Sequence, residues 1–345
     1  MNELAQFCKH LKKGFTPKIK DPKKPVSSWS EKDFLNNKTV DAFVIIFRTK
    51  GCSWALKSGC TMCGYFNDSL WENVSDDDLL VQFEKAMKNY NGQKFVKIFT
   101  SGSFLDDNEI KPKVRKDILS KLAETADKIS VESRPEYITD EKLSEINDIL
   151  NSKNFEIGVG LETANDFVRE YCLNKGFTFE RYEKAAKSLK KHKVELKTYA
   201  LIKPPFLTEK ESINDAIDTV DKIKKLTSTV SFNPTNVQRN TLVNYLWNRQ
   251  QYRPAWLFSV VEILKESKKI AGDVRIKCDT VGGGSIRGAH NCGKCDQGFL
   301  SAISKFSLSQ DLSSLEKLDC NCKEKWLDQL DIEDLSFGSI VDIHD

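Results

Sequence analysis

From residue 42 onward, short apolar runs alternate with amphipathic segments along the chain. The apolar runs are typical of buried strands, and they span Ala42–Arg48, Phe95–Thr100, Lys128–Glu132, Phe155–Leu161, Glu195–Leu201 and Val230–Asn233. Segments with helical spacing lie between them, at Asp76–Asn89, Lys113–Thr125, Thr139–Asn151, Phe167–Leu173, Phe179–Lys191 and Glu209–Leu226. This alternation predicts an α/β fold with a parallel sheet and helical crossovers. Six β-α units favour a partial, open (β/α)6 barrel over a closed barrel of eight units.

The two ends of the chain depart from this pattern. Residues 1–40 are basic and interrupted by prolines, which indicates an N-terminal arm. Beyond the barrel core, residues 41–240, the pattern changes to an aromatic and cysteine-rich region, residues 241–345. There we expect a helix over 255–271, a strand over 273–278 and a helix over 296–307. The sequence thus predicts an arm, a core and a small C-terminal domain that binds metal and RNA or substrate.

A cluster of three cysteines directly follows the first predicted strand. Cys52, Cys60 and Cys63 have the spacing C-x7-C-x2-C. Two thiolates on one tight turn suit a metal ion or an iron–sulfur cluster. A structural zinc site normally has four protein ligands, so a local set of three leaves one coordination position open for a substrate or cofactor. The alternative is half of a zinc knuckle that is completed by later cysteines.

A second group of cysteines lies in the C-terminal region. Its members are Cys278, Cys292, Cys295, Cys320 and Cys322. These are five thiols for a site that should need four, and zinc is the metal that such a set most commonly holds. A second iron–sulfur cluster is the alternative, because thiolates suit both. The spacing does not decide which of Cys278, Cys320 and Cys322 is spare.

Polar or glycine-rich residues follow every predicted strand. In a barrel of this type the loops after the strands gather at one face, where ligands bind. The candidate ligand contacts at these strand ends are Ser101, Gly102, Ser103, Glu132, Arg134 and Glu162. Small residues at 101–103 permit close approach of the backbone to a ligand. An internal ion pair across the barrel mouth is the alternative role for Arg134 and Glu162.

The cysteine loop and the strand ends together resemble radical S-adenosylmethionine (SAM) enzymes. The widened first cysteine gap, Glu132-Ser-Arg-Pro and Gly160-Leu-Glu-Thr are similar to the elongator catalytic subunit and its relatives. Met62 stands where that group often has an aromatic residue. The resemblance implies a [4Fe–4S] cluster on the three loop cysteines and SAM on its open iron. It also implies that residues 101–103 hold the amino end of SAM, that Glu132 and Arg134 hold its methionyl or ribose groups, and that Glu162 accepts from a ribose hydroxyl.

The C-terminal region carries a more specific resemblance. Cys278-Asp-x2-Gly-Gly-Gly-x2-Arg-Gly-x-His-Asn-Cys-Gly-x-Cys-Asp and the later Asp-Cys-x-Cys-Lys-x2-Trp resemble the radical SAM subunit of archaeosine synthase. This resemblance implies tRNA modification, by C–N cleavage of the lysine adduct of 7-cyano-7-deazaguanine in the D-loop. It further implies a complex with the lysine-transferring subunit and an electron donor of the ferredoxin or flavodoxin kind. The residue that completes the radical step is not indicated.

Composition narrows the alternatives only slightly. The net charge is +3, so there is no strong overall basic field, although residues 9–24 form a lysine-rich stretch. No run approaches a membrane span, and the N-terminus has no signal-peptide core, so we expect a cytoplasmic protein. Two alternatives remain. One is a radical SAM enzyme with another tRNA reaction, such as methylthiolation, which needs a second cluster. The other is a non-catalytic zinc-bearing RNA-binding protein.

Overall fold

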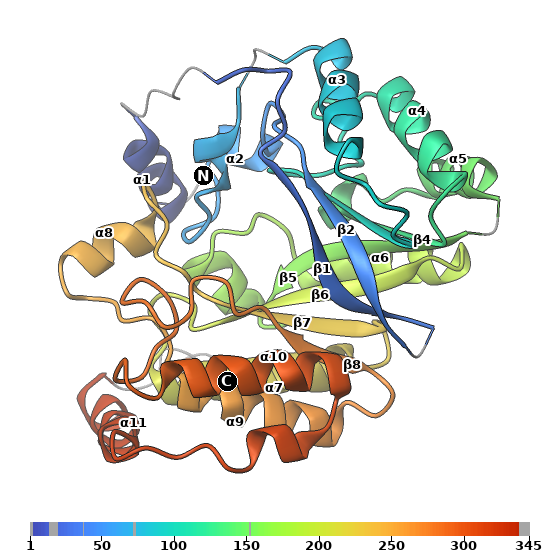
Figure 1. The fold of residues 1–345 in the computed structure, drawn as a ribbon. Coiled ribbons are helices and arrows are strands. Elements are labelled where there is room, and N and C mark those ends of the chain that lie inside the picture. Colours follow the sequence, from blue (N-terminus) through green and yellow to red (C-terminus); the bar gives the residue numbers. More distant parts are fainter. Residues whose placement is uncertain (1–2, 14–19, 37, 72–73, 152, 338–345) are drawn as a thin grey trace.

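The computed structural model describes residues 3–13, 20–36, 38–71, 74–151 and 153–337. They form one eight-stranded sheet whose spatial order follows the chain from β1 to β8 (Figure 1). The strands are β1 Ser27–Leu35, β2 Lys38–Ile46, β3 Phe95–Phe99, β4 Lys128–Glu132, β5 Asn154–Glu162, β6 Glu195–Ile202, β7 Thr229–Pro234 and β8 Arg275–Cys278. β1 runs antiparallel to β2, and the other neighbours pair in parallel.

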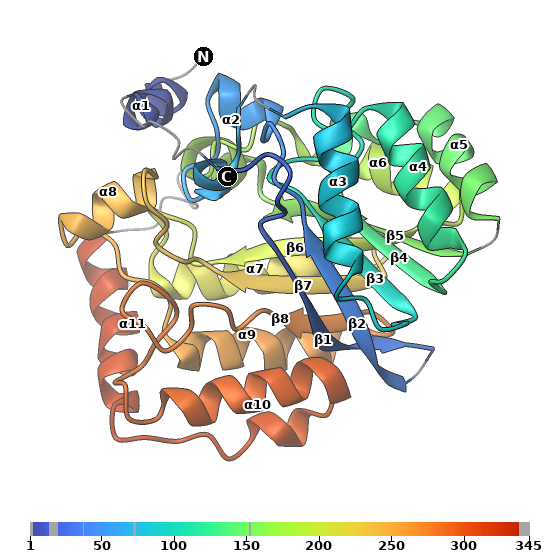
Figure 2. The ribbon, with the colours of Figure 1, turned by 45° about the horizontal axis from the view of Figure 1, so that its top comes forward.

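The main crossover helices cover the outer face of the curved sheet (Figures 1 and 2). They are α3 Asp76–Met87, α4 Pro112–Ala123, α5 Asp140–Leu150, α6 Phe179–Lys191, α7 Glu209–Ile223 and α9 Leu257–Ile270. Outward-facing strand residues such as Ile98, Val131 and Ile157 are fully buried in one apolar core with these helices. The opposite strand positions face the interior of the half-barrel, and several carry charge, among them Lys97, Lys128 and Lys197.

The remaining helices lie at the ends of the chain and in the loops. The α-helices are α1 Glu3–Lys12, α2 Ser53–Lys57, α8 Leu242–Asn248, α10 Asp296–Ser309 and α11 Lys323–Phe337. Short 3-10 turns span Tyr65–Asp68, Pro135–Tyr137 and Leu312–Leu315, and a π-helical turn spans Val168–Cys172. Among the described residues, no helix is long and apolar enough to cross a membrane.

The structure contains the six predicted core strands. It also has an edge strand, β1, and it places the expected strand at 273–278 in the same sheet. Residues 27–35, which the sequence places in a basic arm, form the edge strand β1 instead, so that part of the prediction is wrong. The predicted strand at 273–278 appears as β8, and it pairs with β7 in the same sheet through Phe232 and Cys278. Residues beyond 240 therefore extend the sheet of the core. The helix expected over 167–173 is a π-helical turn over 168–172.

Candidate functional site

The three-cysteine loop lies at the carboxyl end of β2, as the sequence predicts. Cys52 precedes α2, and glycines with positive φ at 51 and 59 turn the chain on either side of that helix. The thiols of Cys52, Cys60 and Cys63 lie close enough to influence one another electrostatically. Burial raises the pKa of Cys63 to about 12 and also raises that of Cys52. Thiolates at these positions need positive charge nearby to be stable.

Positive groups and backbone N–H groups surround the loop thiols. The positive charge of Arg134 lowers the pKa of Cys52 and so offsets part of the effect of burial. The charge of Lys175 does the same for the pKa of Cys63. The backbone of Ala55 contacts the Cys52 sulfur, and the backbone of Tyr65 contacts the Cys63 sulfur. These donors favour the ionised thiols that a metal centre requires. The residues present therefore fit a cluster ligated by three cysteines.

Residues 172–174, which follow β5, hold the cysteine loop in place by hydrogen bonds. Thr61, inside the loop, donates its backbone N–H to Leu173 O at 3.0 Å and its hydroxyl to Cys172 O at 2.8 Å. Asn174 donates to Gly59 O at 2.7 Å, and Asn174 O accepts from the Trp54 indole at 2.8 Å. These four contacts fix the loop before any ligand is present. Sequence reasoning missed them because the partners are more than 100 residues apart.

Helix α1 braces the same loop from the other side. Lys12 Nζ donates to Ala55 O at 2.9 Å and to Ser58 O at 2.7 Å. The Ser58 hydroxyl donates to Ala5 O at 3.0 Å. Gly59 has a φ of +88°, a conformation that glycine adopts without strain, and a Cβ there would also displace the Lys12 ammonium. The ammonium of Lys12 is a further cation near the three thiols, a role that the local sequence pattern does not indicate.

The small residues after β3 lie directly against the cysteine loop. A Cβ on Gly102 would lie 2.6 Å from Cys52 Cα, so only glycine fits there. The Ser103 hydroxyl accepts from the Arg134 backbone N–H at 3.0 Å, and the Ser101 hydroxyl donates to Tyr65 O at 3.5 Å. The predicted proximity of strand ends β2, β3 and β4 is therefore present.

Arg134 and Glu162 each have an internal partner. Arg134 Nε donates to Glu136 at 2.5 Å and its Nη2 to Lys175 O at 3.0 Å, while Nη1 makes no hydrogen bond to a described residue. Glu162 accepts from Lys175 Nζ at 2.6 Å. Glu162 has a φ of +70° at a bulge in β5, which turns its side chain into the mouth. Sequence reasoning did not find Lys175, which joins both residues.

Glu132 points inward from the end of β4. Burial raises its pKa, although the Tyr199 hydroxyl bonds to the carboxylate and lowers it again. Among the described residues Glu132 has no ion pair. It is therefore an acidic group near the mouth whose charge is left for a ligand or for solvent.

Four cysteines of the C-terminal region form a second site. Their Sγ atoms lie within 4.8 Å of one another, and the residues are Cys292, Cys295, Cys320 and Cys322. Neighbouring sulfurs are 3.8 Å apart for the pairs 292/295, 292/320 and 295/322. Bonds of about 2.3 Å to one tetrahedral metal ion separate sulfurs by roughly 3.8 Å. The group therefore has the dimensions of a site for a single metal ion.

Cys278 is the spare thiol that the sequence could not identify. It is buried in the core and its Sγ lies 3.5 Å from Asp279 O, outside the group of four. A metal role for Cys278 is therefore not supported by the arrangement. His290, also near these cysteines in sequence, bonds to Gly288 O at 2.8 Å.

The loop cysteines have a different arrangement from the tail cysteines. Within the described part of the chain, Cys52, Cys60 and Cys63 do not form a set closer than 4.8 Å. A four-iron cluster holds its thiolates on separate irons, and so it needs them further apart than one metal ion does. The two sites thus differ in the way that a cluster and a single ion would require.

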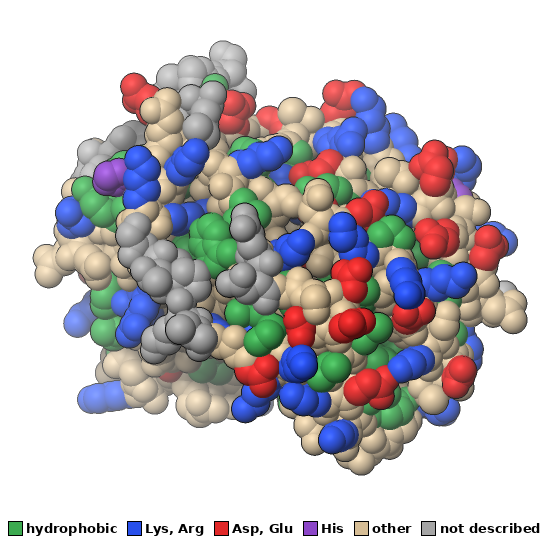
Figure 3. Space-filling model, turned by 90° about the horizontal axis from the view of Figure 1, so that it is seen from above, with side chains coloured by type: hydrophobic (Ala, Val, Ile, Leu, Met, Phe, Trp, Pro, Cys, Tyr) green, Lys and Arg blue, Asp and Glu red, His purple; other side chains and the backbone are tan. Residues whose placement is uncertain are grey.

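Three arginines stack on aromatic rings beside the barrel mouth. Arg249 lies 3.6 Å above Tyr245, Arg253 lies 3.9 Å above Trp256, and Arg287 lies 4.6 Å above Trp247. Two of these rings belong to α8. Arg287 also donates to Asn244 at 2.6 Å, which holds the glycine-rich loop 279–291 against α8. Figure 3, which looks onto the side that carries α1, α2 and α3, shows basic and acidic side chains interspersed rather than a continuous basic field.

Comparison with known proteins places this site in a family. Residues 46–217 match the radical SAM superfamily. Archaeosine synthase subunit beta of Methanosarcina acetivorans is 42% identical over 92% of this chain and 93% of that protein. The chain belongs to the archaeosine synthase subunit beta family. It is a radical SAM enzyme.

A second relative agrees with this assignment. Archaeosine synthase subunit beta of Thermococcus kodakarensis is 39% identical over 86% of this chain and 94% of its own length. Together with the family match over residues 46–217, these relatives confirm the expectation of a radical SAM barrel. Among solved structures, archaeal Elp3 of Methanocaldococcus infernus aligns with a TM-score of 0.49 and 16% identity, over 71% of this chain and 59% of that chain.

Proposed function

We propose that this protein modifies tRNA by cleaving a C–N bond in the lysine adduct of 7-cyano-7-deazaguanine, which leaves archaeosine. The observation that carries the proposal is the 42% identity with an archaeosine synthase subunit beta over almost the whole chain. The substrate and bond follow from the resemblance, and the chain's own residues support the chemistry as follows.

In this proposal Cys52, Cys60 and Cys63 hold a [4Fe–4S] cluster, and SAM binds at its open iron. When bound, the cluster and SAM supply reductive cleavage of SAM and removal of hydrogen from an unactivated carbon. The loop is held rigidly by Thr61, Asn174 and Lys12, as described above. A rigid loop keeps the reactive centre in one position and excludes water, which this chemistry requires.

Residues at the strand ends are placed to bind SAM. Arg134 lies near Cys52, and its Nη1 has no hydrogen-bond partner among the described residues, so it can bind a carboxylate. Ser101, Gly102 and Ser103 bring backbone and hydroxyl groups next to Cys52, where the amino end would lie. We assign Glu132 and Glu162 to the remaining methionyl or ribose contacts. Glu162 would act together with Lys175.

We further propose that the four-thiol group holds zinc. The sulfur separations of 3.8 Å match one tetrahedral ion and thiolate donors suit zinc. The ion would join the loop at 292–295 to the start of α11. These dimensions disfavour the methylthiolation alternative, because that reaction would need a second cluster there.

The proposed partners meet the protein around the mouth. Arginine–aromatic stacks at α8 and the loop 279–291 offer planar surfaces for an extruded base. Helix α1 packs on α8 through Phe7 and Tyr245, and we assign the exposed Lys9 and Lys13 of the α1 region to phosphate contacts. We also propose a complex with the lysine-transferring subunit, a ferredoxin- or flavodoxin-like electron donor and a cytoplasmic location.

The test is nucleoside analysis after an anaerobic reaction. Reconstituted protein, SAM and a reductant are incubated with tRNA that carries the lysine adduct, and the digest is analysed by mass spectrometry. Archaeosine and 5′-deoxyadenosine should both appear with the wild type and be absent with Cys60→Ala. If SAM is cleaved but the adduct is unchanged, the substrate assignment is wrong.

A further inference from the structure

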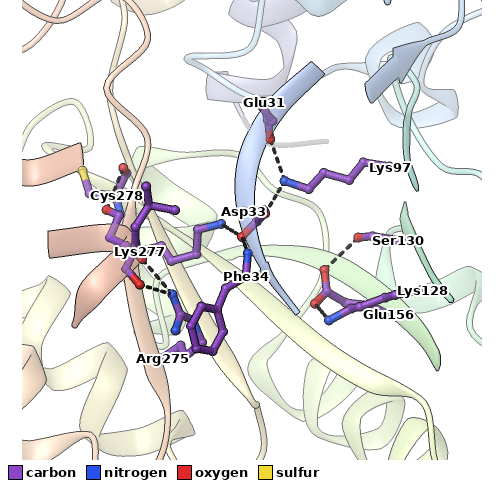
Figure 4. A network of polar contacts seen from close by, with 12 residues as sticks. Glu31, Asp33, Phe34, Lys97, Lys128, Ser130, Glu156, Arg275, Lys277 and Cys278 are labelled. Atoms are coloured by element: carbon purple, nitrogen blue, oxygen red, sulfur yellow. Dashed lines mark hydrogen bonds and ion pairs between the residues drawn. The ribbon is translucent and has the colours of Figure 1, made fainter. Parts of the chain in front are cut away.

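Four lysines on the strands face the interior of the half-barrel. Three of them are paired, and Figure 4 shows these three. Lys97 bonds to Asp33 and, at 2.6 Å, to Glu31. Lys128 bonds to Glu156 at 2.8 Å and to Glu195 at 2.7 Å, and Lys277 bonds to Asp33 at 2.7 Å. The fourth is Lys197, on β6.

Lys197 is buried but has no hydrogen bond or ion pair with any described residue. It is 6% exposed, and no carboxylate oxygen of the described residues lies within 4.0 Å of its Nζ. Its ammonium lies 5.1 Å from the centre of the Tyr199 ring, which belongs to the same strand two residues nearer the mouth. The side chain is therefore directed toward the mouth. Lys197 Nζ is not among the side-chain atoms that are both fully buried and unpartnered, so its three N–H donors are accessible to water or to a ligand inside the half-barrel.

The surroundings of Lys197 restrict the charge of such a ligand. Burial alone would raise the pKa of Glu156, but Lys197 and Lys128 lower it to about 2, so Glu156 stays ionised close to Lys197. Lys197 also acts on Asp33 and on Glu132. The four lysines face Glu31, Asp33, Glu156 and Glu195, and Glu132 is a fifth acid within reach of Lys197, so the lysines carry no excess of positive charge. A dianion such as phosphate would be repelled by these acids, whereas a carboxylate that brings its own ammonium keeps the balance.

The strand register places a residue without a side chain beside Lys197. Lys197 is in register with Gly158 of β5, and Gly158 with Glu132 of β4. Gly158 carries no side chain, and Tyr199 leans over it, since a Cβ there would lie 2.8 Å from the tyrosine ring. The strand continues from Lys197 to Ile202 at the mouth, a rise of about 16 Å at ~3.3 Å per residue. The side chains of Lys197 and of a substrate lysine, each roughly 6 Å long, cover most of this span from opposite ends.

We propose that Lys197 binds the α-carboxylate of the amino-acid head of the substrate, inside the barrel below the SAM site. This inference rests on the proposed function, because that function supplies a substrate whose lysine side chain ends in a zwitterionic head. The neighbouring carboxylates favour the ammonium of the same head. Lys197 thus selects lysine adducts over amines that lack a carboxylate, and it fixes how deep the chain inserts.

The test compares two tRNA substrates that differ only in the carboxylate: the lysine adduct and the 1,5-diaminopentane adduct. We expect wild-type protein to show a kcat/KM about 10- to 100-fold higher for the lysine adduct, the range of a charged hydrogen bond. Lys197→Met should lower the value for the lysine adduct to that for the diaminopentane adduct, which itself should change less than about twofold. Lys197→Arg should keep part of the preference.

Lys187→Met, on the exposed face of α6, is the matched control and should behave as wild type. Iron content and unfolding temperature check that Lys197→Met is folded. If the wild type processes both adducts equally, or if Lys197→Met slows both equally, the carboxylate role is wrong while the proposed function stands. If the wild type cleaves SAM but processes neither adduct, the proposed function itself fails, and the assignment of Lys197 fails with it. The comparison of substrates on wild type and Lys197→Arg decides the matter should Lys197→Met not fold.

Discussion

Arg134 illustrates how single residues at the mouth are constrained. Its guanidinium lies between the Trp54 ring at 5.5 Å and the Phe177 ring at 5.2 Å, and it donates to Glu136 and to Lys175 O. Only a planar, forked group stacks on two rings and keeps one edge for a ligand. The spacing of Glu132-Ser-Arg-Pro could suggest a SAM contact. The stacking and Lys175 come from distant segments, so the sequence could not reveal them.

Arg134→Lys tests this reading directly. We expect SAM affinity, measured by calorimetry on anaerobically reconstituted protein, to fall by about tenfold or more, because lysine loses the fork and the stacking. Iron content should stay near the wild-type value. Arg181→Lys is the control, since the Arg181 side chain is exposed and donates a long hydrogen bond of 3.3 Å to Glu136 O. Unchanged affinity in Arg134→Lys would remove this residue from the SAM site.

The tail cysteines provide a second test at the level of single residues. Cys320→Ser should lose bound zinc and lower the unfolding temperature, because the proposed ion joins the loop at 292–295 to the start of α11. Cys278→Ser should keep zinc, since its sulfur lies outside the group of four. Zinc per chain is measured by mass spectrometry of the purified variants. Retained zinc in Cys320→Ser, or lost zinc in Cys278→Ser, would contradict the ligand set.

At the scale of elements, β1 is the strand that the sequence pattern did not predict. Ser27–Leu35 has no run of apolar residues, because its inward positions carry Glu31 and Asp33 rather than aliphatic side chains. Asp33 bonds to Lys97 on β3 and to Lys277 on β8, so one carboxylate links β1 to both sides of the sheet. Arg275 of β8 stacks 3.9 Å from the Phe34 ring beside it. The ion pair of Asp33 with Lys277 and the contact of Arg275 with the Phe34 ring thus hold β1 against β8.

Asp33→Asn should therefore destabilise the protein strongly. Removing this carboxylate leaves the buried Lys277 without its partner and Lys97 with Glu31 alone, and costs on the order of 3 kcal/mol of unfolding free energy. Asp41→Asn, in the same hairpin, breaks the exposed pair with Lys32 and should cost less than about 1 kcal/mol. Urea unfolding at pH 7 measures both. Equal effects of the two changes would contradict the role of Asp33.

The pH dependence of that contribution has a defined sign. Burial alone would raise the pKa of Asp33, but Lys277 and Lys97 hold it well below its ordinary value. A depressed pKa in the folded state means that the stabilisation is complete above about pH 4 and is lost as the pH falls below it. The difference between wild type and Asp33→Asn should thus shrink in acid. A difference that grows as the pH falls would reverse the assignment.

Helix α1 gives a second test at the scale of elements. Lys12→Met removes the two hydrogen bonds that the Lys12 ammonium donates to the cysteine loop, so the loop should hold its cluster less firmly. We expect the visible absorbance of the cluster to bleach several-fold faster in air than in the wild type. Lys9→Met, an exposed position on the same helix, should leave the bleaching rate unchanged. Equal rates in all three proteins would show that α1 does not protect the loop.

At the scale of the whole molecule, most of the sheet and both cysteine sites could be predicted from the sequence. β3 to β7 carry aliphatic outward faces, and their alternation with helices is a local signal. The inward face is different, because the partners of Lys97, Lys128 and Lys277 depend on how neighbouring strands are aligned. A local sequence pattern does not show this alignment. The buried network, the Lys175 contacts and the choice among five tail cysteines could therefore be seen only in the three-dimensional structure.

The most direct test of the account is the metal content of the anaerobically reconstituted protein. The proposed chemistry requires a redox cluster on the loop cysteines, and the proposed tail site requires a single ion on the tail cysteines. Iron, sulfide and zinc per chain are measured for wild type and for Cys60→Ala. The account predicts about four irons and about one zinc in the wild type, with the iron lost and the zinc kept in the variant. Zinc alone in the wild type, or about eight irons, would contradict it.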